Sequence, residues 1–129
     1  MQYLSDEWFV AANAALESNH KLTDVLADVR ITIGQTVLDA PSGTVTWGLV
    51  IDRGSAQLVV GPIPHADVRF RTSYQVAAAV AAGRLGAPAA FLRGDLSVGG
   101  DLHLLTANQR ALAAVDDVLA EVRQATDLG

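Results

Sequence analysis

The side chains best placed for acid–base or metal chemistry in this sequence lie between residues 95 and 103. Asp101 and His103 are two positions apart, so on a strand they would share one face, with Asp95 or Ser97 nearby. Such a set could form an acid–base pair or a cation site. The leucines that alternate with them indicate instead a polar row that faces water. We therefore expect no catalytic residue and no metal ligand, and an enzyme that uses Asp95, Asp101 and His103 is only the third hypothesis.

The other candidate motifs are weaker. Residues 95–99 read Asp-Leu-Ser-Val-Gly, so Asp stands where a nucleophile elbow has its first glycine, and the segment lies within a predicted strand. His65 follows a proline in a turn, where a histidine is usually solvated. Arg69 and Arg71 share the face opposite Phe70. They could bind a carboxylate or a phosphate, although a solvated sheet face is the favoured interpretation.

The composition excludes several classes of function. The 129 residues include no cysteine, which excludes disulfides, zinc–thiolate sites, iron–sulfur clusters and cysteine nucleophiles. There is no G-x-G-x-x-G motif and no P-loop, and the three histidines are far apart, so no cofactor and no metal is predicted. The net charge of −5 and the pI of about 4.9, without a basic stripe, argue against nucleic acid and against strong membrane association.

The chain carries no signal for export or for membrane insertion. Its first residues have neither a positively charged nor an apolar region of the kind found in a secretory signal. The longest unbroken apolar run covers residues 76–82, well short of the ~18 needed to span a bilayer. We expect a soluble, cytoplasmic protein. A length of 129 residues fits a single domain over 1–129.

Apolar residues recur every three or four positions in three parts of the chain, which predicts helices at 4–19, 72–83 and 109–125. A proline-initiated short helix is predicted at 88–92. Ser5 is expected to cap the first helix, and Thr72 or Ser73 the second. In the last helix, Asp116 and Arg123 are expected to face water.

Alternation with a period of two predicts strands at 29–33, 44–52, 57–60, 68–71 and, with a bend at a glycine pair, 96–104. Short connections between the first four strands indicate an antiparallel meander. The order of the elements predicts an α+β fold, in which helices pack on one face of a mainly antiparallel sheet.

The chain is rich in small apolar residues. Half of its residues are hydrophobic, only 18% are charged and only 5% are aromatic, and its mean hydropathy is +0.28. The strand residues Trp47 and Leu49, the rings of Phe70 and Phe91, and the helix face within 112–119 can all point into one interior. These side chains either pack closely or surround a cavity, and the residues by themselves leave both arrangements open.

One long stretch carries a family pattern. Residues 66–74 read Ala-Asp-Val-Arg-Phe-Arg-Thr-Ser-Tyr, and residues 89–101 read Ala-Ala-Phe-Leu-Arg-Gly-Asp-Leu-Ser-Val-Gly-Gly-Asp. Between them, an alanine-rich helix ends at a glycine. This stretch resembles the sterol carrier protein type-2 family of lipid-binding domains. The positions that match as a set are Gly83, Phe91, Gly94, Gly100 and Asp101. The resemblance is strongest over residues 66–112 and extends by pattern to about 3–125.

The resemblance implies a five-stranded, mainly antiparallel sheet covered on one face by helices, with an apolar tunnel between the two layers. It implies that a fatty acid, an acyl-CoA, a sterol or another lipid binds there without catalysis and without a cofactor. An acyl chain would gain ~0.8 kcal/mol for each buried methylene. By the resemblance, Phe91 packs near the tunnel. The other lipid contacts are assigned to residues that the pattern of each strand or helix places on its inward face. The predicted lipid-binding residues are Trp47, Leu49, Phe70, Val80, Phe91, Leu105, Leu112 and Val115.

Two functions therefore stand ahead of an enzyme. The first is a small intracellular carrier that holds a fatty acyl or sterol-like ligand in an apolar tunnel. The alternative is a non-catalytic dimerisation or interaction module of the same fold. That module predicts an exposed apolar patch, or a homodimer, in place of the cavity.

Overall fold

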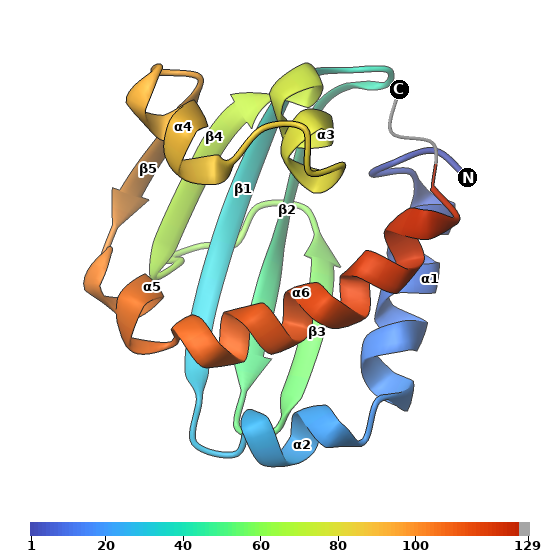
Figure 1. Ribbon diagram of the computed structural model, residues 1–129, viewed down its shortest axis with the longest axis vertical. Helices are drawn as coiled ribbons and strands as arrows, with labels where there is room; N and C mark the ends of the chain where they lie inside the picture. Colours follow the sequence, from blue (N-terminus) through green and yellow to red (C-terminus); the bar gives the residue numbers. More distant parts are fainter. Residues whose placement is uncertain (127–129) are drawn as a thin grey trace.

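The computed structural model describes residues 1–126 and arranges them as one sheet with helices on one of its faces (Figure 1). The strands are β1 (Arg30–Ala40), β2 (Gly43–Asp52), β3 (Ser55–Val60), β4 (Val68–Ser73) and β5 (Leu96–Gly100). The helices are α1 (Asp6–Ser18), α2 (Lys21–Val25), α3 (Tyr74–Ala81), α4 (Ala87–Leu92), α5 (His103–Ala107) and α6 (Gln109–Gln124).

The sheet has the strand order β3-β2-β1-β4-β5. Three neighbouring pairs are antiparallel, and β1 pairs with β4 in parallel. The predicted α+β fold with a five-stranded, mainly antiparallel sheet is therefore confirmed. The predicted four-stranded meander is wrong, because only the first three strands form one and β4 lies on the free edge of β1.

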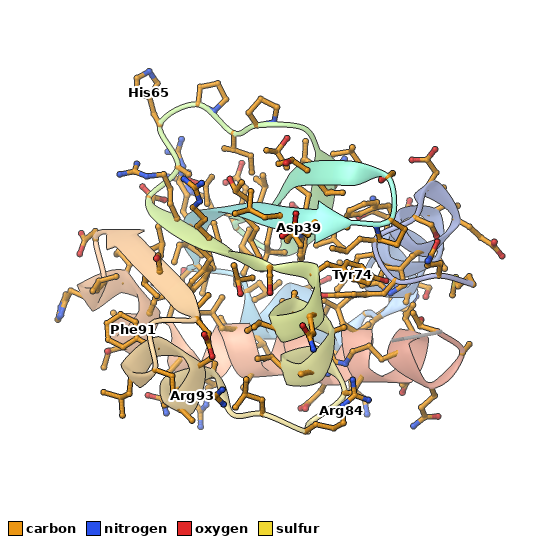
Figure 2. All side chains as sticks on the ribbon, turned by 90° about the horizontal axis from the view of Figure 1, so that it is seen from above. Asp39, His65, Tyr74, Arg84, Phe91 and Arg93 are labelled. Carbon is orange, nitrogen blue, oxygen red and sulfur yellow. The ribbon has the colours of Figure 1, made fainter. Side chains whose placement is uncertain are left out.

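The loop over residues 61–67 explains how β4 reaches that edge. The loop crosses the face of the sheet that lies away from the helices, and Figure 2 shows His65 on this side of the molecule. A glycine of the sheet makes room for it, because a Cβ atom at Gly48 would clash with the side chain of Ile63. The loop also passes close to Gly34, where a Cβ atom would lie in van der Waals contact with Ala66 (3.4 Å). The return of the chain thus leaves the opposite face free for the helices.

Helix α1 is fixed to the outer edge of the sheet. The Ser5 hydroxyl accepts a hydrogen bond from the backbone N–H of Trp8 (3.2 Å), as the predicted N-cap. The side-chain amide of Asn13 donates to the carbonyl of Leu58 (3.0 Å) and accepts from the N–H of the same residue (2.7 Å). The edge strand β3 thereby gains partners for backbone groups that would otherwise be unpaired.

Helices α3 and α6 cover the middle of the same face (Figure 1). Ser73 rather than Thr72 caps α3, since its hydroxyl accepts from the N–H of Val76 (3.2 Å). The Thr72 hydroxyl instead donates to the carbonyl of Asp95 (2.8 Å), which joins β4 to the start of β5. Five residues of α6 are buried: Ala111, Val115, Val118, Leu119 and Val122.

The chain departs from the predicted strand 96–104 at Gly100. This glycine has φ 90°, and a Cβ atom there would meet the carbonyl oxygen of Asp67. The N–H of Asp101 donates to that carbonyl (2.8 Å), and β5 ends. The next residues form helix α5, so the prediction of a strand up to residue 104 is wrong. Helix α2 was not predicted, and β1 continues well beyond residue 33.

Candidate functional site

A cavity of about 520 Å³ lies between the helix-covered face of the sheet and the helices above it. Its lining is mostly aliphatic and aromatic, from β1 to β5 below and from α1, α3 and α6 above. Ligand cavities of proteins commonly hold ~300–1,000 Å³, so the volume is that of a site for a small molecule. We take this cavity as the candidate functional site.

The register of the strands builds the floor of the cavity. Directly paired residues of adjacent strands share a face, so Gln35 of β1 lies between Trp47 of β2 and Phe70 of β4. One step along β1, Ile33 pairs with Leu49. All five of these residues line the cavity. The alternation in the sequence therefore identifies the inward-facing side of β2 and β4 correctly.

Helices α3 and α6 supply the roof. From α3 come two valines and two alanines at helical spacing, Val76, Ala77, Val80 and Ala81. The alanines are short, which leaves volume between this helix and the sheet. From α6 come Leu112, Val115, Asp116, Leu119 and Arg123. One face of α6 thus gives three apolar residues together with the charged residues Asp116, at the middle of the helix, and Arg123, near its end.

Seven of the eight predicted lipid-binding residues lie around this cavity: Trp47, Leu49, Phe70, Val80, Leu105, Leu112 and Val115. The eighth, Phe91, is outside the lining and is 49% exposed. The buried residue of α4 is Ala90, whereas the neighbouring ring is half-exposed. That any of these residues contacts a lipid stays a prediction.

The sequence also left several lining residues unassigned. Trp8 lies in the predicted helix 4–19, but no local feature of the sequence connects that helix to the cavity. Gln35 lies beyond the predicted end of its strand, although it is two positions after Ile33 and therefore faces the same side of the sheet. Asp116 and Arg123 were expected to face water, and both line the cavity.

Four aromatic rings, which we call the aromatic cluster, pack at one wall: Tyr3, Trp8, Phe9 and Trp47. Trp8 makes edge-to-face contacts with Tyr3, Phe9 and Trp47, with ring centroids 5.0, 5.1 and 5.9 Å apart. The indole N–H groups of Trp8 and Trp47 are buried and have no hydrogen-bond partner among the described residues. A buried N–H without a hydrogen bond lowers the stability of the fold. Edge-to-face packing places ring edges against the π faces of their neighbours, which offsets part of this loss of stability.

The charged groups of the lining are Asp116 and Arg123. Nη1 of Arg123 lies 3.1 Å from Oδ1 of Asp116, and the Arg123 side chain is 18% exposed against 66% for that of Asp116. Burial raises the pKa of the nearby Tyr3 hydroxyl to about 12, and the charge of Arg123 opposes this shift. Tyr3 is therefore neutral over the physiological pH range. The cavity thus offers one partly buried cation beside a long apolar surface.

The residues of the enzyme hypothesis lie outside the cavity. The Asp95 carboxylate pairs with Arg93 (3.3 Å), before β5 begins. Oδ1 of Asp101 accepts from the backbone N–H of His103 (3.2 Å), at the start of α5. The prediction that Asp101 and His103 share a strand face is wrong, because His103 belongs to a helix. Within residues 1–126, no group of three or more histidine or carboxylate side chains could hold a metal ion.

The chain thus forms an α+β sheet that helices roof over, with an apolar cavity between the two layers. The SCP-2 sterol transfer family matches residues 12–113 of the chain. The chain belongs to this family, which confirms the resemblance seen in the sequence and implies a role in lipid binding or transfer. No curated protein matches the chain. That residues 1–129 form one domain stays a prediction.

Solved structures share the fold. A conserved hypothetical protein from Thermus thermophilus, named as a candidate sterol carrier protein, has a TM-score of 0.70 at 22% identity and covers 95% of this chain and 90% of its own. A crystal structure of sterol carrier protein 2 has a TM-score of 0.70 at 20% identity, with 93% and 98% covered. The palmitated SCP2L2 protein of Aedes aegypti has a TM-score of 0.55 at 16% identity, with 90% and 95% covered.

No helix within residues 1–126 is long and apolar enough to span a bilayer.

Proposed function

We propose that this chain is a non-catalytic lipid carrier that holds one fatty acyl or sterol-like ligand in the cavity between the sheet and helices α1, α3 and α6. The observation that carries the proposal is the cavity of about 520 Å³ with its mostly apolar lining. An apolar ligand is transferred into such a lining with a gain of ~25 cal/mol for each Å² of apolar surface removed from water.

The arrangement of polar groups supports a carrier rather than an enzyme. The carboxylates and the histidine of the enzyme hypothesis do not line the cavity. The charged residues that line the cavity are Asp116 and Arg123, and they already form an ion pair with each other. Catalysis of acyl transfer or hydrolysis needs an activated nucleophile within reach of a base, and the lining offers no such pair.

Two ligand classes fit the lining. A fatty acid would place its chain over the sheet and its carboxylate near Arg123, and the word "palmitated" in the name of the Aedes aegypti relative supports this class. A sterol-like ligand would use the apolar walls alone, and the name of the family supports it. The alternative of a dimerisation module is not favoured, because it predicts a filled interior rather than a cavity.

Filling the cavity tests the proposal. Ala81 lines the cavity from α3, and its neighbour Ala82 is exposed and outside the lining. We expect Ala81→Trp to lower the affinity for a fluorescent fatty acid and for a fluorescent sterol by at least ~10-fold, because the indole occupies the ligand volume. The matched control, Ala82→Trp, should bind as the wild type does.

Both proteins are first compared by circular dichroism and urea unfolding, so that loss of fold is not taken for loss of binding. If a folded Ala81→Trp protein binds both probes as tightly as Ala82→Trp, the cavity is not the binding site. If the wild type binds neither probe, and native mass spectrometry shows no lipid that co-purifies with it, the carrier function itself is wrong.

A further inference from the structure

One polar residue stands among apolar ones on the floor of the cavity. Gln35 belongs to β1, the central strand of the sheet (Figure 1), and lines the cavity. The other inward-facing residues along the same strand are Ile31, Ile33 and Val37, which are at most 5% exposed. A glutamine in this row interrupts an apolar pattern, and a polar group inside a protein needs a hydrogen-bond partner.

The side-chain amide of Gln35 has no such partner within the part of the chain that the structure describes. Thr72 also lines the floor, but its hydroxyl donates to the carbonyl of Asp95 (2.8 Å). Trp47, directly opposite Gln35 on β2, has a buried indole N–H that is likewise without a partner among residues 1–126. The floor therefore contains hydrogen-bonding groups that the folded chain does not use.

A ligand in the cavity changes the surroundings of this amide. Gln35 is only partly buried, so water can reach it while the cavity holds no ligand. A plain hydrocarbon chain laid over the floor would exclude that water and leave the amide without any hydrogen bond, which weakens binding. A hydroxyl group at the same place would replace the water, because a hydroxyl both donates and accepts.

The distribution of charge favours an uncharged group beside Gln35. Among the described residues, those of the strands bring no charged side chain to the lining. The charged residues of the lining belong to α6, where Asp116 and Arg123 pair with each other. A carboxylate against Gln35 would lose its water without gaining a cation, which is strongly unfavourable. A hydroxyl group carries no charge and avoids this loss.

We propose that Gln35 binds an uncharged hydroxyl group on the body of an apolar ligand and selects such ligands over plain hydrocarbon chains. The hydroxyl accepts from the amide N–H or donates to the amide oxygen. This inference rests on the proposed function, because it names the ligand group that the carrier recognises inside the same cavity. Two kinds of molecule carry such a group: a sterol-like molecule, on a ring, and a hydroxylated fatty acid, part-way along its chain.

Two matched pairs of ligands test the proposal on the wild type. One pair is a sterol and its analogue without the ring hydroxyl, and the other is stearic acid and a hydroxystearic acid with its hydroxyl at mid-chain. Displacement of a fluorescent fatty acid measures each affinity. We expect the hydroxyl-bearing member of at least one pair to bind ~5–10-fold more tightly, because only this member restores the hydrogen bond of Gln35. The pair that shows the preference identifies the source of the hydroxyl.

Gln35→Met removes the amide and keeps an unbranched side chain of similar length. This variant should bind the hydroxyl-bearing ligand ~5–10-fold more weakly and its partner at least as tightly as the wild type does, so the preference disappears. The matched control is Gln57→Met, because Gln57 is exposed on β3 and lies outside the lining. The control should keep the preference of the wild type.

Urea unfolding distinguishes ligand recognition from a structural role. Gln35→Met should be at least as stable as the wild type, since it removes an unpartnered polar group from an apolar floor. A residue that served only the fold would show the reverse: lower stability, with equal losses of affinity for both members of each pair. The comparison of ligands on the wild type does not depend on how the variant folds.

The outcomes separate this inference from the carrier function. If the wild type binds both members of both pairs equally, or if Gln35→Met keeps the preference, the role of Gln35 is wrong and the carrier function stands. An equal loss for stearic and hydroxystearic acid in Gln35→Met would place the carboxylate at the amide and would also overturn the inference. If the wild type binds neither the fluorescent fatty acid nor any of the four ligands, the carrier function itself fails.

Discussion

The two sides of the cavity are built in opposite ways. At the aromatic cluster, Trp8 and Trp47 are 1% and 6% exposed, and Trp8 packs edge to face against three other rings. At the α3–α4 roof, the side chains that face the cavity are alanines and valines, and the large apolar residues of α4 face water. The wall at the aromatic cluster is part of the packed core, whereas the wall at α3 and α4 buries few large side chains.

This difference shows where the cavity can open. Local opening costs least where few apolar contacts must be broken, and α3 and α4 each bury a single alanine, Ala78 and Ala90. The aromatic cluster must instead stay closed, because moving Trp8 would expose the centre of the core. We therefore expect the ligand to enter beside α3 and α4, and the aromatic cluster to stabilise the folded state.

The largest expected effect is on stability. Trp8→Ala should lower the free energy of unfolding by ~3–5 kcal/mol, because it removes a fully buried ring and leaves a hole among its neighbours. Leu92→Ala, on the roof, should change it by less than ~0.5 kcal/mol, since its side chain is already in water. Urea unfolding followed by circular dichroism measures both values. Similar losses for the two variants would contradict the contrast between the walls.

The sequence was sufficient to place the inward-facing residues of β2 and β4 on the side of the cavity that the strands form. A strand exposes alternate residues to one face, so Trp47, Leu49 and Phe70 could be placed inside without knowledge of the topology. The helix residues Val80, Leu112 and Val115 follow from helical periodicity in the same way. Such local patterns agree with the fold, because the spacing of apolar residues along the chain reflects which side chains are buried.

The sequence could not supply features that depend on distant contacts. The parallel pairing of β1 with β4 results from the loop 61–67, whose Ile63 packs where a Cβ atom at Gly48 would stand, and no local pattern marks that glycine. Phe91 is apolar and lies within the family pattern, yet Ala90 takes the buried position of α4. Side-chain type alone does not say which of two apolar neighbours faces the core.

A pair of serines sharpens the comparison. Ser5 caps α1 beside the aromatic cluster, and Ser73 caps α3 at the roof, each through a 3.2 Å hydrogen bond from an N–H three residues on. Removal of either cap by Ser→Ala should cost ~1 kcal/mol. In Ser5→Ala the loss should appear in urea unfolding. In Ser73→Ala it should also appear as faster hydrogen exchange in α3 and faster release of the fluorescent fatty acid.

Stopped-flow dilution of the bound probe measures that release. Each serine variant is compared with the other, because both lose a capping hydrogen bond of the same length, and Ser5→Ala additionally loses the bond that its hydroxyl donates to the carbonyl of Gln2 (2.6 Å). An equal rate of release from both variants would mean that the roof is no easier to open than the wall beside α1.

The smallest expected effect distinguishes the two ligand classes. The Asp116 carboxylate is the ion-pair partner of Arg123, and the pair borders the cavity (3.1 Å). Asp116→Asn removes the competing carboxylate, so a fatty acid whose carboxylate lies near Arg123 should bind ~2–5-fold more tightly, the range that a pair this open to water allows. A neutral sterol has no group that this change affects, and its affinity should stay constant. Arg123→Gln should have the opposite sign for the fatty acid and again none for the sterol. If both substitutions leave both affinities unchanged, the headgroup lies away from α6, and Arg123 serves only as the ion-pair partner of Asp116 within the same helix.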